Sequence, residues 1–274
     1  MKIGFIADNF YPDVQRGAEI EDRIIIEEGL RRGHEIVKIG PMVKDVDLYI
    51  VANFIDTFNH GELMAYLSRR PYVNIEHDLR GPQYAFYPAF ARDAIINVYH
   101  SPYQRDFIEK FAGKFNSFLH PMCMPATFKP MTVKRHPKNQ ILFVGDYSWE
   151  KGYKELVEWL VENKRCKIWH YGGGFDKHHP KMREMGYVGQ ETMPLIYNQF
   201  KSLIFLPHYP QACSRVIAEA YLCKMRNIIT NGKDGFTSYG WTMKDYDRIR
   251  EVLINGHVHF WDKLEEEGIV NAHN

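Results

Sequence analysis

The sequence predicts an α/β fold built from two doubly wound, Rossmann-like lobes with a cleft between them. Short runs of β-branched and aromatic residues alternate with longer runs of helical period. The same alternation restarts after a proline-rich segment at 121–137, and 274 residues suffice for two domains of ordinary size. Strands separated by helices pair in parallel through right-handed crossovers, so each lobe is expected to hold an open parallel sheet.

The first lobe is expected over residues 1–125. Its strands are predicted at 2–7, 35–39, 46–51, 72–75 and 95–98. A helix is predicted over 18–32, where isoleucines recur at helical spacing and Gly33 follows in the position that usually ends a helix. A second, shorter helix is predicted at 62–68.

The second lobe is expected over residues 138–242. Its strands are predicted at 140–145, 166–171, 187–188, 203–206 and 227–230. Helices are predicted at 153–163 and 216–222, and the tail at 243–268 is also helix-prone. Ligands of such folds bind at the carboxyl ends of the strands, so the cleft is the expected site.

Composition excludes several classes of protein. The charge is nearly balanced, with 35 Lys and Arg against 34 Asp and Glu, which argues against a polyanion binder that works by bulk charge. The uncharged stretch between Lys201 and Arg215 contains two prolines and is shorter than the ~20 residues of a membrane span. Asp8 follows the first apolar run too soon for a secretory signal. The four cysteines form no Cys-x-x-Cys pair, so free thiols and a cytoplasmic location are expected.

Three strand-to-helix loops could direct backbone N–H groups and a helix dipole at an anion. In the first, Gln15–Glu19, Gly17 would permit close approach of a phosphate or sugar, although an ordinary turn would look the same. In the second, Val144–Gly152, Lys151 stands at a helix start, where a cation is unfavourable unless an anion neutralises it. A solvated surface lysine is the alternative.

A third loop, Pro210–Ala220, leads into a helix that Glu219 interrupts with a charge among apolar residues. A buried carboxylate needs a partner, so hydrogen bonds to ligand hydroxyls and a structural ion pair are the two interpretations.

These three loops, in this order, resemble the motifs of the retaining GT-B-fold glycosyltransferases of glycosyltransferase family 4, also called glycosyl transferases group 1. The first loop resembles the family's Gly-Gly-x-Glu turn and the second its Val-Gly-Arg-x-x-x-Glu-Lys-Gly phosphate loop. Gln211–Glu219 falls on its Glu-x7-Glu segment. Weaker matches to the family's pattern are found at Glu76–Asp78 and Thr127–Pro130, so the resemblance covers nearly the whole chain.

The resemblance implies transfer of a sugar from a nucleotide-diphosphate donor to a hydroxyl, with retention and without a metal or further cofactor. Lys151, assisted by Arg215, would stabilise charge on the departing diphosphate. Glu219 would accept hydrogen bonds from ribose hydroxyls, and Gln211 would contact the transferred sugar. His77 would bind a sugar hydroxyl or lie beside the reacting centre.

The resemblance also assigns Arg16, Gly17 and Gly145 to the donor site. The tail at 243–274, with Trp261 and Leu264 available for docking, is expected to pack back on the first lobe.

The acceptor is expected in the first lobe, near Asp78, Arg80 and Tyr84. The aromatic segment at 81–92 suits stacking on a sugar or on a nucleobase, and core packing explains its rings equally well. A glycan, a small molecule and a hydroxymethylated base in DNA are the acceptors considered. The slight acidity of the first lobe argues against DNA.

The chain departs from the family's pattern at several positions. Asp146 replaces the Arg of the phosphate loop, Gln211 the first Glu of the Glu-x7-Glu segment, and Arg16 the first Gly of the glycine pair. One hypothesis is that Arg16, Lys224 or Arg226 replaces the missing cation. A non-catalytic or degenerate nucleotide-sugar-binding module is the alternative function, and a sugar-nucleotide epimerase is a third hypothesis.

No catalytic metal is expected from the sequence. His178-His179 and His257-Val258-His259 lack partners at zinc-site spacing. The basic run Lys177–Arg183 is typical of a solvated loop. No obligatory protein partner is evident.

Overall fold

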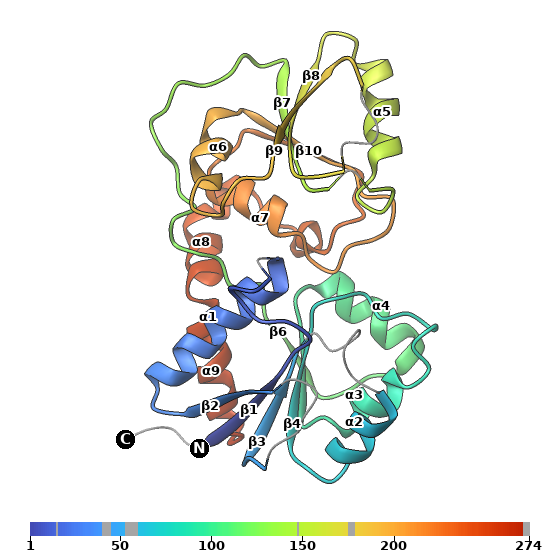
Figure 1. Cartoon of the computed structure of the whole chain (residues 1–274), viewed down its shortest axis with the longest axis vertical. Coiled ribbons are helices and arrows are strands. Elements are labelled where there is room, and N and C mark those ends of the chain that lie inside the picture. Colours follow the sequence, from blue (N-terminus) through green and yellow to red (C-terminus); the bar gives the residue numbers. More distant parts are fainter. Residues whose placement is uncertain (15, 40–44, 53–59, 147, 175–178, 271–274) are drawn as a thin grey trace. The chain divides into compact units, whose positions relative to one another are not determined.

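The computed structural model describes residues 1–14, 16–39, 45–52, 60–146, 148–174 and 179–270 (Figure 1). The chain divides into two compact units. The first consists of Met1–Cys123 and Glu251–Asn274, and the second of Met124–Arg250. The second crossing between them follows Arg250, inside helix α8 (Tyr246–Ile254) and eight residues beyond the expected boundary at 242. Each unit contains one parallel sheet flanked by helices, which confirms the predicted α/β class.

The first unit is built on a six-stranded sheet in which every neighbouring pair is parallel. From one edge to the other its strands are β2 (Glu35–Ile39), β1 (Lys2–Ile6), β3 (Leu48–Val51), β4 (Tyr72–Glu76), β5 (Ile96–Tyr99) and β6 (Ser117–Leu119). Its helices are α1 (Gly17–Arg31), α2 (His60–Leu67), α3 (Tyr87–Asp93), α4 (Pro102–Ala112) and α9 (Gly256–Glu266). Gly33 has φ of +82° beyond the end of α1, as expected for a helix-ending glycine.

Helices α1 and α9 cover one face of this sheet, and α2, α3 and α4 cover the other (Figure 1). The contact between α1 and α9 centres on Trp261, whose indole N–H donates to the carbonyl of Ile25 at 2.9 Å. A methyl group on Gly29 would lie 2.4 Å from the Trp261 ring, so a residue without a side chain lets the two helices approach. The tail therefore completes the core of the first unit.

The second unit has a five-stranded parallel sheet. Its order is β11 (Asn227–Thr230), β10 (Ser202–Phe205), β7 (Gln140–Val144), β8 (Lys167–Tyr171) and β9 (Met182–Gly186). Its helices are α5 (Tyr153–Glu162), α6 (Met193–Gln199), α7 (Arg215–Leu222) and the start of α8, with 3-10 turns at Gly235–Tyr239 and Met243–Asp245.

The strand predicted at 187–188 is wrong, because β9 occupies Met182–Gly186 instead. Gly186 has φ of +81°, which ends the strand, and Tyr187 beyond it is 74% exposed.

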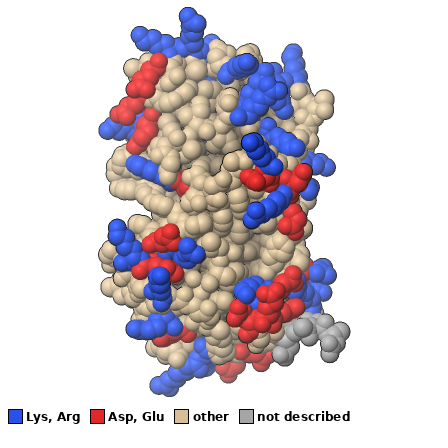
Figure 2. All heavy atoms as spheres, turned by 180° about the vertical axis from the view of Figure 1, so that it is seen from behind, with Lys and Arg blue, Asp and Glu red and all other residues tan. Residues whose placement is uncertain are grey.

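None of the helices in the described part of the chain combines the length and apolar character that crossing a bilayer requires. On the face drawn in Figure 2, basic and acidic side chains are both present and neither sign covers the surface continuously.

Candidate functional site

The loop after β7 is shaped by two glycines and lies against the end of β10. Gly145 has φ of +130° and Gly152 has φ of +83°. A methyl group on Gly152 would lie 1.7 Å from the carbonyl oxygen of Leu206, so only glycine fits there. Chain order reverses between the neighbouring strands β7 and β10, and such switch points are where open α/β sheets bind ligands. Lys151 is therefore held at the sheet edge where folds of this kind bind their ligands.

Gln211 meets Lys151 at this edge. The Lys151 ammonium donates a hydrogen bond of 2.8 Å to Oε1 of Gln211. Gln211 follows β10, and its backbone is fixed by hydrogen bonds of 2.9 Å with Lys233 and with Gly235. Two of the three loops predicted from the sequence are thus brought together.

Asp234 forms an isolated β-bridge with Gln211 and interacts electrostatically with Lys151, and it was not predicted. Its side chain is 1% exposed, and Oδ1 accepts the N–H of Phe236 at 2.8 Å. Burial raises the pKa of Asp234 to about 7, although N–H groups of Phe236 and Ser214 and the Lys151 ammonium oppose the shift. The sequence signal was only an Asp-Gly pair, which is typical of a turn.

Glu219 lies one turn into α7, which begins after Ser214. Its carboxylate is buried and lies 3.5 Å from Nε of Arg215, so the structural ion pair considered from the sequence is present. Burial raises the pKa of Glu219 although Arg215 and Tyr197 oppose the shift. The Tyr197 hydroxyl beside it has its pKa raised by burial and by this carboxylate. The third loop therefore brings its predicted cation and carboxylate together.

Asp146 has a structural role where the family's pattern has an arginine. Its Oδ1 accepts a hydrogen bond from the N–H of Gly173 at 3.0 Å and another from the Tyr187 hydroxyl at 2.6 Å. These bonds tie the glycine turn after β8 to the loop after β7. The ring of His170 adds a bond of 2.6 Å to the carbonyl of Gly145. Neighbouring Tyr147, like Gln15 in the first loop, lies outside the described residues.

Lys224 and Arg226 do not replace the missing cation. Arg226 directly precedes β11 and Lys224 ends the turn after α7, so both lie at the amino-terminal edge of the sheet, opposite the edge that carries Lys151. The Lys224 ammonium lies 3.9 Å from the ring centroid of Tyr246. Lys233 is a cation at the same sheet edge as Lys151, because it follows β11. Its ammonium donates to the carbonyl of His208 at 2.9 Å. Sequence reasoning missed it. Arg16 precedes α1 in the first unit, and its predicted role, like that of Gly17, stays a prediction.

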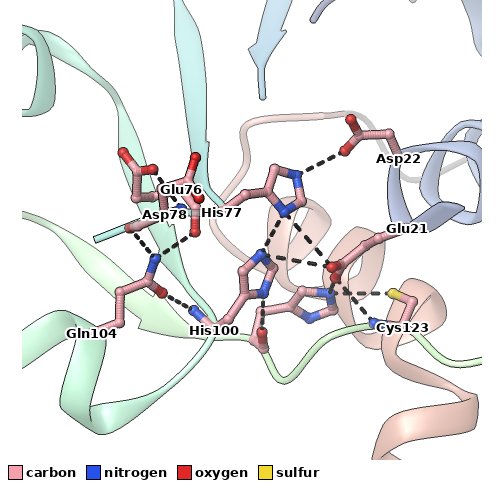
Figure 3. A network of polar contacts seen from close by, with 9 residues as sticks. Glu21, Asp22, Glu76, His77, Asp78, His100, Gln104 and Cys123 are labelled. Carbon is pink, nitrogen blue, oxygen red and sulfur yellow. Dashed lines mark hydrogen bonds and ion pairs between the residues drawn. The ribbon is translucent and has the colours of Figure 1, made fainter. Parts of the chain in front are cut away.

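The first unit carries a histidine immediately after each of three adjacent strands: His120 after β6, and His77 after β4 and His100 after β5, the last two of which Figure 3 labels. His77 Nδ1 lies 3.1 Å from Nε2 of His100. His77 Nε2 lies 3.0 Å from Oδ1 of Asp22, and His100 Nδ1 donates to the carbonyl of His120 at 2.9 Å. Both ring nitrogens of His77 are thus engaged within the unit.

Glu21 is the centre of this cluster. Its carboxylate is 3% exposed, and ring nitrogens of His77, His100 and His120 lie 3.7–3.8 Å from its oxygens. Burial would raise the pKa of Glu21, but the three histidines and the N–H of Cys123 outweigh it and the pKa is lowered. Burial would lower the pKa of His77, but Asp22 and Glu21 raise it to about 9. Burial lowers the pKa of His120 to about 3.

Arg80 is fixed inside the first unit. Its Nε lies 3.1 and 3.0 Å from the two carboxylate oxygens of Glu76, and its side chain is 2% exposed. The N–H of Asp78 donates to the same carboxylate at 2.9 Å. Gln104 donates to the carbonyls of Glu76 and Asp78 at 2.7 and 2.8 Å. The guanidinium lies 5.1 Å from the ring centroid of Tyr84. The acceptor roles of Asp78, Arg80 and Tyr84 stay predictions.

The aromatic segment at 81–92 contributes to the core. Tyr87 and Phe90 are buried in the cluster beneath α2, α3 and α4, and the partly buried rings of Tyr84 and Phe86 pack against it. Core packing therefore accounts for the rings of Tyr87 and Phe90, the two most buried aromatic side chains of the segment.

Sequence reasoning also missed most of the histidine cluster. The histidines singled out from the sequence were His178-His179 and the two of His257-Val258-His259, and His178 lies outside the described residues. The unrecognised members are Glu21, Asp22, His100, His120 and Cys123. The sequence signal that could have revealed the cluster is a histidine directly after each of three strands, one of which was not predicted.

No protein-family model matches the sequence, and no curated protein matches it. Solved structures do match the fold. Sucrose-phosphate synthase from Thermosynechococcus elongatus has a TM-score of 0.68 at 12% identity, covering 98% of this chain and 96% of that chain. HepE from Anabaena, solved in complex with UDP and glucose, has a TM-score of 0.64 at 14% identity, with 94% of each chain covered. A glycosyltransferase from Rickettsia africae has a TM-score of 0.63 at 13% identity, covering 98% of this chain and 99% of that chain.

At these identities the likeness establishes the fold. The chain has the GT-B fold of glycosyltransferases, as the sequence predicts. Membership of family 4 and retention of configuration stay predictions.

Proposed function

We propose that the protein is a glycosyltransferase that moves a sugar from a nucleoside-diphosphate sugar to a hydroxyl group. The observation that carries the proposal is the meeting of Lys151 and Gln211 at the β7–β10 switch point, in a chain with the fold of glycosyltransferases. HepE was solved with UDP and glucose, so UDP-glucose is the first donor to test.

The chemistry requires stabilisation of the negative charge that grows on the departing diphosphate. Lys151 is suited to this task because Gln211, which holds its ammonium, is neutral and leaves the positive charge in place. The amino terminus of α7 follows Gln211 in the same loop and adds backbone N–H groups. Gly145, at the start of the Lys151 loop, lets the backbone approach the phosphates.

Glu219 and Arg215 complete the donor site in this proposal. In the donor complex, ribose hydroxyls would donate hydrogen bonds to the buried carboxylate of Glu219, which is paired with Arg215 in this structure. Arg215 would then turn toward the diphosphate as a second cation. Gln211 would contact the transferred sugar, and transfer would proceed with retention and without a metal at the diphosphate. The acceptor is a hydroxyl on a glycan, a small molecule or a modified base.

A non-catalytic nucleotide-sugar-binding module is the second candidate. The observation that favours it is the position of Asp146, which places a carboxylate bonded to Gly173 and Tyr187 where a phosphate-binding arginine is expected. A module of this kind would bind the donor without turnover.

A thermal-shift screen with UDP-, GDP- and ADP-sugars tests the proposal. A donor present at 100 times its Kd stabilises the native state by about 2.7 kcal/mol, which raises Tm by several degrees. We expect one nucleotide class to do so, Lys151→Ala to abolish the shift, and Lys154→Ala, on the exposed side of α5, to retain it.

Release of labelled sugar from that donor then separates transfer or hydrolysis from binding alone. The proposal fails if no nucleotide sugar stabilises the protein or if Lys151→Ala binds like the native protein.

A further inference from the structure

We propose that Glu21, His77 and His100 in the first unit form a binding site for a divalent transition-metal ion, with Zn²⁺ as the probe. This inference goes beyond the proposed function and does not depend on it, because it concerns only the cluster at the ends of β4 and β5. It also departs from the expectation that no catalytic metal binds, because that expectation rested on His178-His179 and His257-Val258-His259 and not on His77 and His100.

The three candidate ligand atoms are spaced as ligands of one ion. Nδ1 of His77 and Nε2 of His100 are 3.1 Å apart, and they lie 3.8 and 3.7 Å from Oε2 of Glu21. The point equidistant from the three atoms, the circumcentre of this triangle, lies about 2.1 Å from each, the usual length of Zn–N and Zn–O bonds. The contacts to Glu21 are too long for hydrogen bonds.

The remaining ring nitrogens are held in the way that metal-binding histidines require. Nε2 of His77 faces the Asp22 carboxylate at 3.0 Å, and Nδ1 of His100 donates to the carbonyl of His120 at 2.9 Å. A hydrogen bond at one ring nitrogen fixes the tautomer and turns the other nitrogen's lone pair toward the ion. Figure 3 shows the His77 ring between Asp22 and the His100 ring, with Glu21 pointing toward both rings.

Burial and charge favour a cation at this position. Glu21 and Asp22 are adjacent in α1 and only 3% and 1% exposed. Two carboxylates removed from water require compensating positive charge. A divalent ion bound by Glu21 and the two imidazoles would supply it as the Nδ1 proton of His77 is released, and imidazole with carboxylate is a ligand set that suits Zn²⁺ and Fe²⁺.

A second group, formed by Glu21, His120 and Cys123, lies on the other side of the same carboxylate. His120 Nε2 is 3.7 Å from Oε1 of Glu21 and 3.4 Å from Sγ of Cys123. Oε1 already accepts the N–H of Cys123 at 3.0 Å, whereas Oε2 is the oxygen nearest both His77 and His100. We therefore assign the ion to the His77–His100 side.

The bound ion would join α1 to the carboxyl ends of β4 and β5. Three protein ligands leave one position for water or a hydroxyl group. With the ion present, His77 acts as a ligand and not as the hydrogen-bonding group for a sugar that the sequence suggested.

The test uses tag-free, full-length protein that is stripped with a chelator and titrated with Zn²⁺ and Co²⁺. We expect one equivalent per chain, and visible ligand-field bands with Co²⁺ but no near-ultraviolet band from a thiolate-to-cobalt transition. Glu21→Gln and His100→Gln should weaken binding at least about 100-fold, and Asp22→Asn by about 10–100-fold through loss of the bond to His77.

Two variants serve as controls, with circular dichroism checking the fold of each protein. Cys123→Ser should bind like the native chain, and so should His34→Gln, which changes another buried histidine of the same unit that stacks on Trp261. Absence of stoichiometric binding, or undiminished binding in the folded Glu21→Gln or Asp22→Asn protein, overturns the proposal. A thiolate band that Cys123→Ser removes overturns the assignment, because it places the ion on the His120–Cys123 side.

Discussion

Lys151 and Gln211, 60 residues apart in the sequence, are joined by a hydrogen bond of 2.8 Å at the edge where β7 and β10 lie side by side. The contact depends on Gly152, because the next residue after Lys151 must pass the end of β10 without a side chain. The position of the ammonium is therefore set by backbone packing as well as by its hydrogen bond.

Replacing Gly152 by alanine should be strongly destabilising. The new methyl group would lie 1.7 Å from the Leu206 carbonyl oxygen at a φ of +83°, so both collision and backbone strain act. We expect a loss of about 3 kcal/mol or more in the free energy of unfolding.

Gly232→Ala is the matched control, since its φ is +77° but no atom lies within 4 Å of the added methyl. It should lose only about 1 kcal/mol. Denaturant unfolding followed by tryptophan fluorescence checks both, because Trp149, Trp159, Trp169 and Trp241 all lie in the second unit. Equal losses in the two variants would show that collision with β10 is not the cause.

Asp234 should make stability depend on pH between about 4 and 7. Its pKa is raised from 3.8 to about 7 by burial, so the native state keeps a proton that the unfolded chain has lost. Raising the pH through this window therefore lowers the free energy of unfolding, by up to about 4 kcal/mol, and the loss levels off above pH 7.

Asp234→Asn removes the titrating group and keeps an oxygen for the N–H of Phe236. The variant should gain stability relative to the native protein as the pH rises from 4.5 to 7.5, measured by denaturant unfolding at each pH. Parallel pH profiles for the two proteins would mean that Asp234 ionises at its ordinary pKa.

The sequence predicts the parts of the site that follow a strand and precede a helix. Lys151 and Gln211 belong to this class, because a loop of that kind has a known place at the sheet edge, and Glu219 follows in the first turns of α7. Asp234 was missed because it comes close through an isolated bridge with Gln211, a contact that no local pattern encodes.

The histidine cluster was missed for a topological reason. His77, His100 and His120 are 23 and 20 residues apart, and they become neighbours only when β4, β5 and β6 are known to be adjacent. The strand β6 has three residues, too few for its period to be recognised.

The cation that the phosphate loop lacks is expected to come from Lys233, which follows β11 on the same sheet edge as Lys151. Lys233→Ala should weaken binding of the nucleoside-diphosphate sugar by about tenfold at low salt, and by less at high salt because the side chain is exposed and screened. Lys224→Ala is the matched control, since it removes the same charge from the opposite edge of the sheet and should leave the affinity unchanged. Calorimetric titration at two ionic strengths measures both. A Lys224→Ala protein that loses as much affinity as Lys233→Ala would show that net charge, and not the position of the ammonium, governs donor binding.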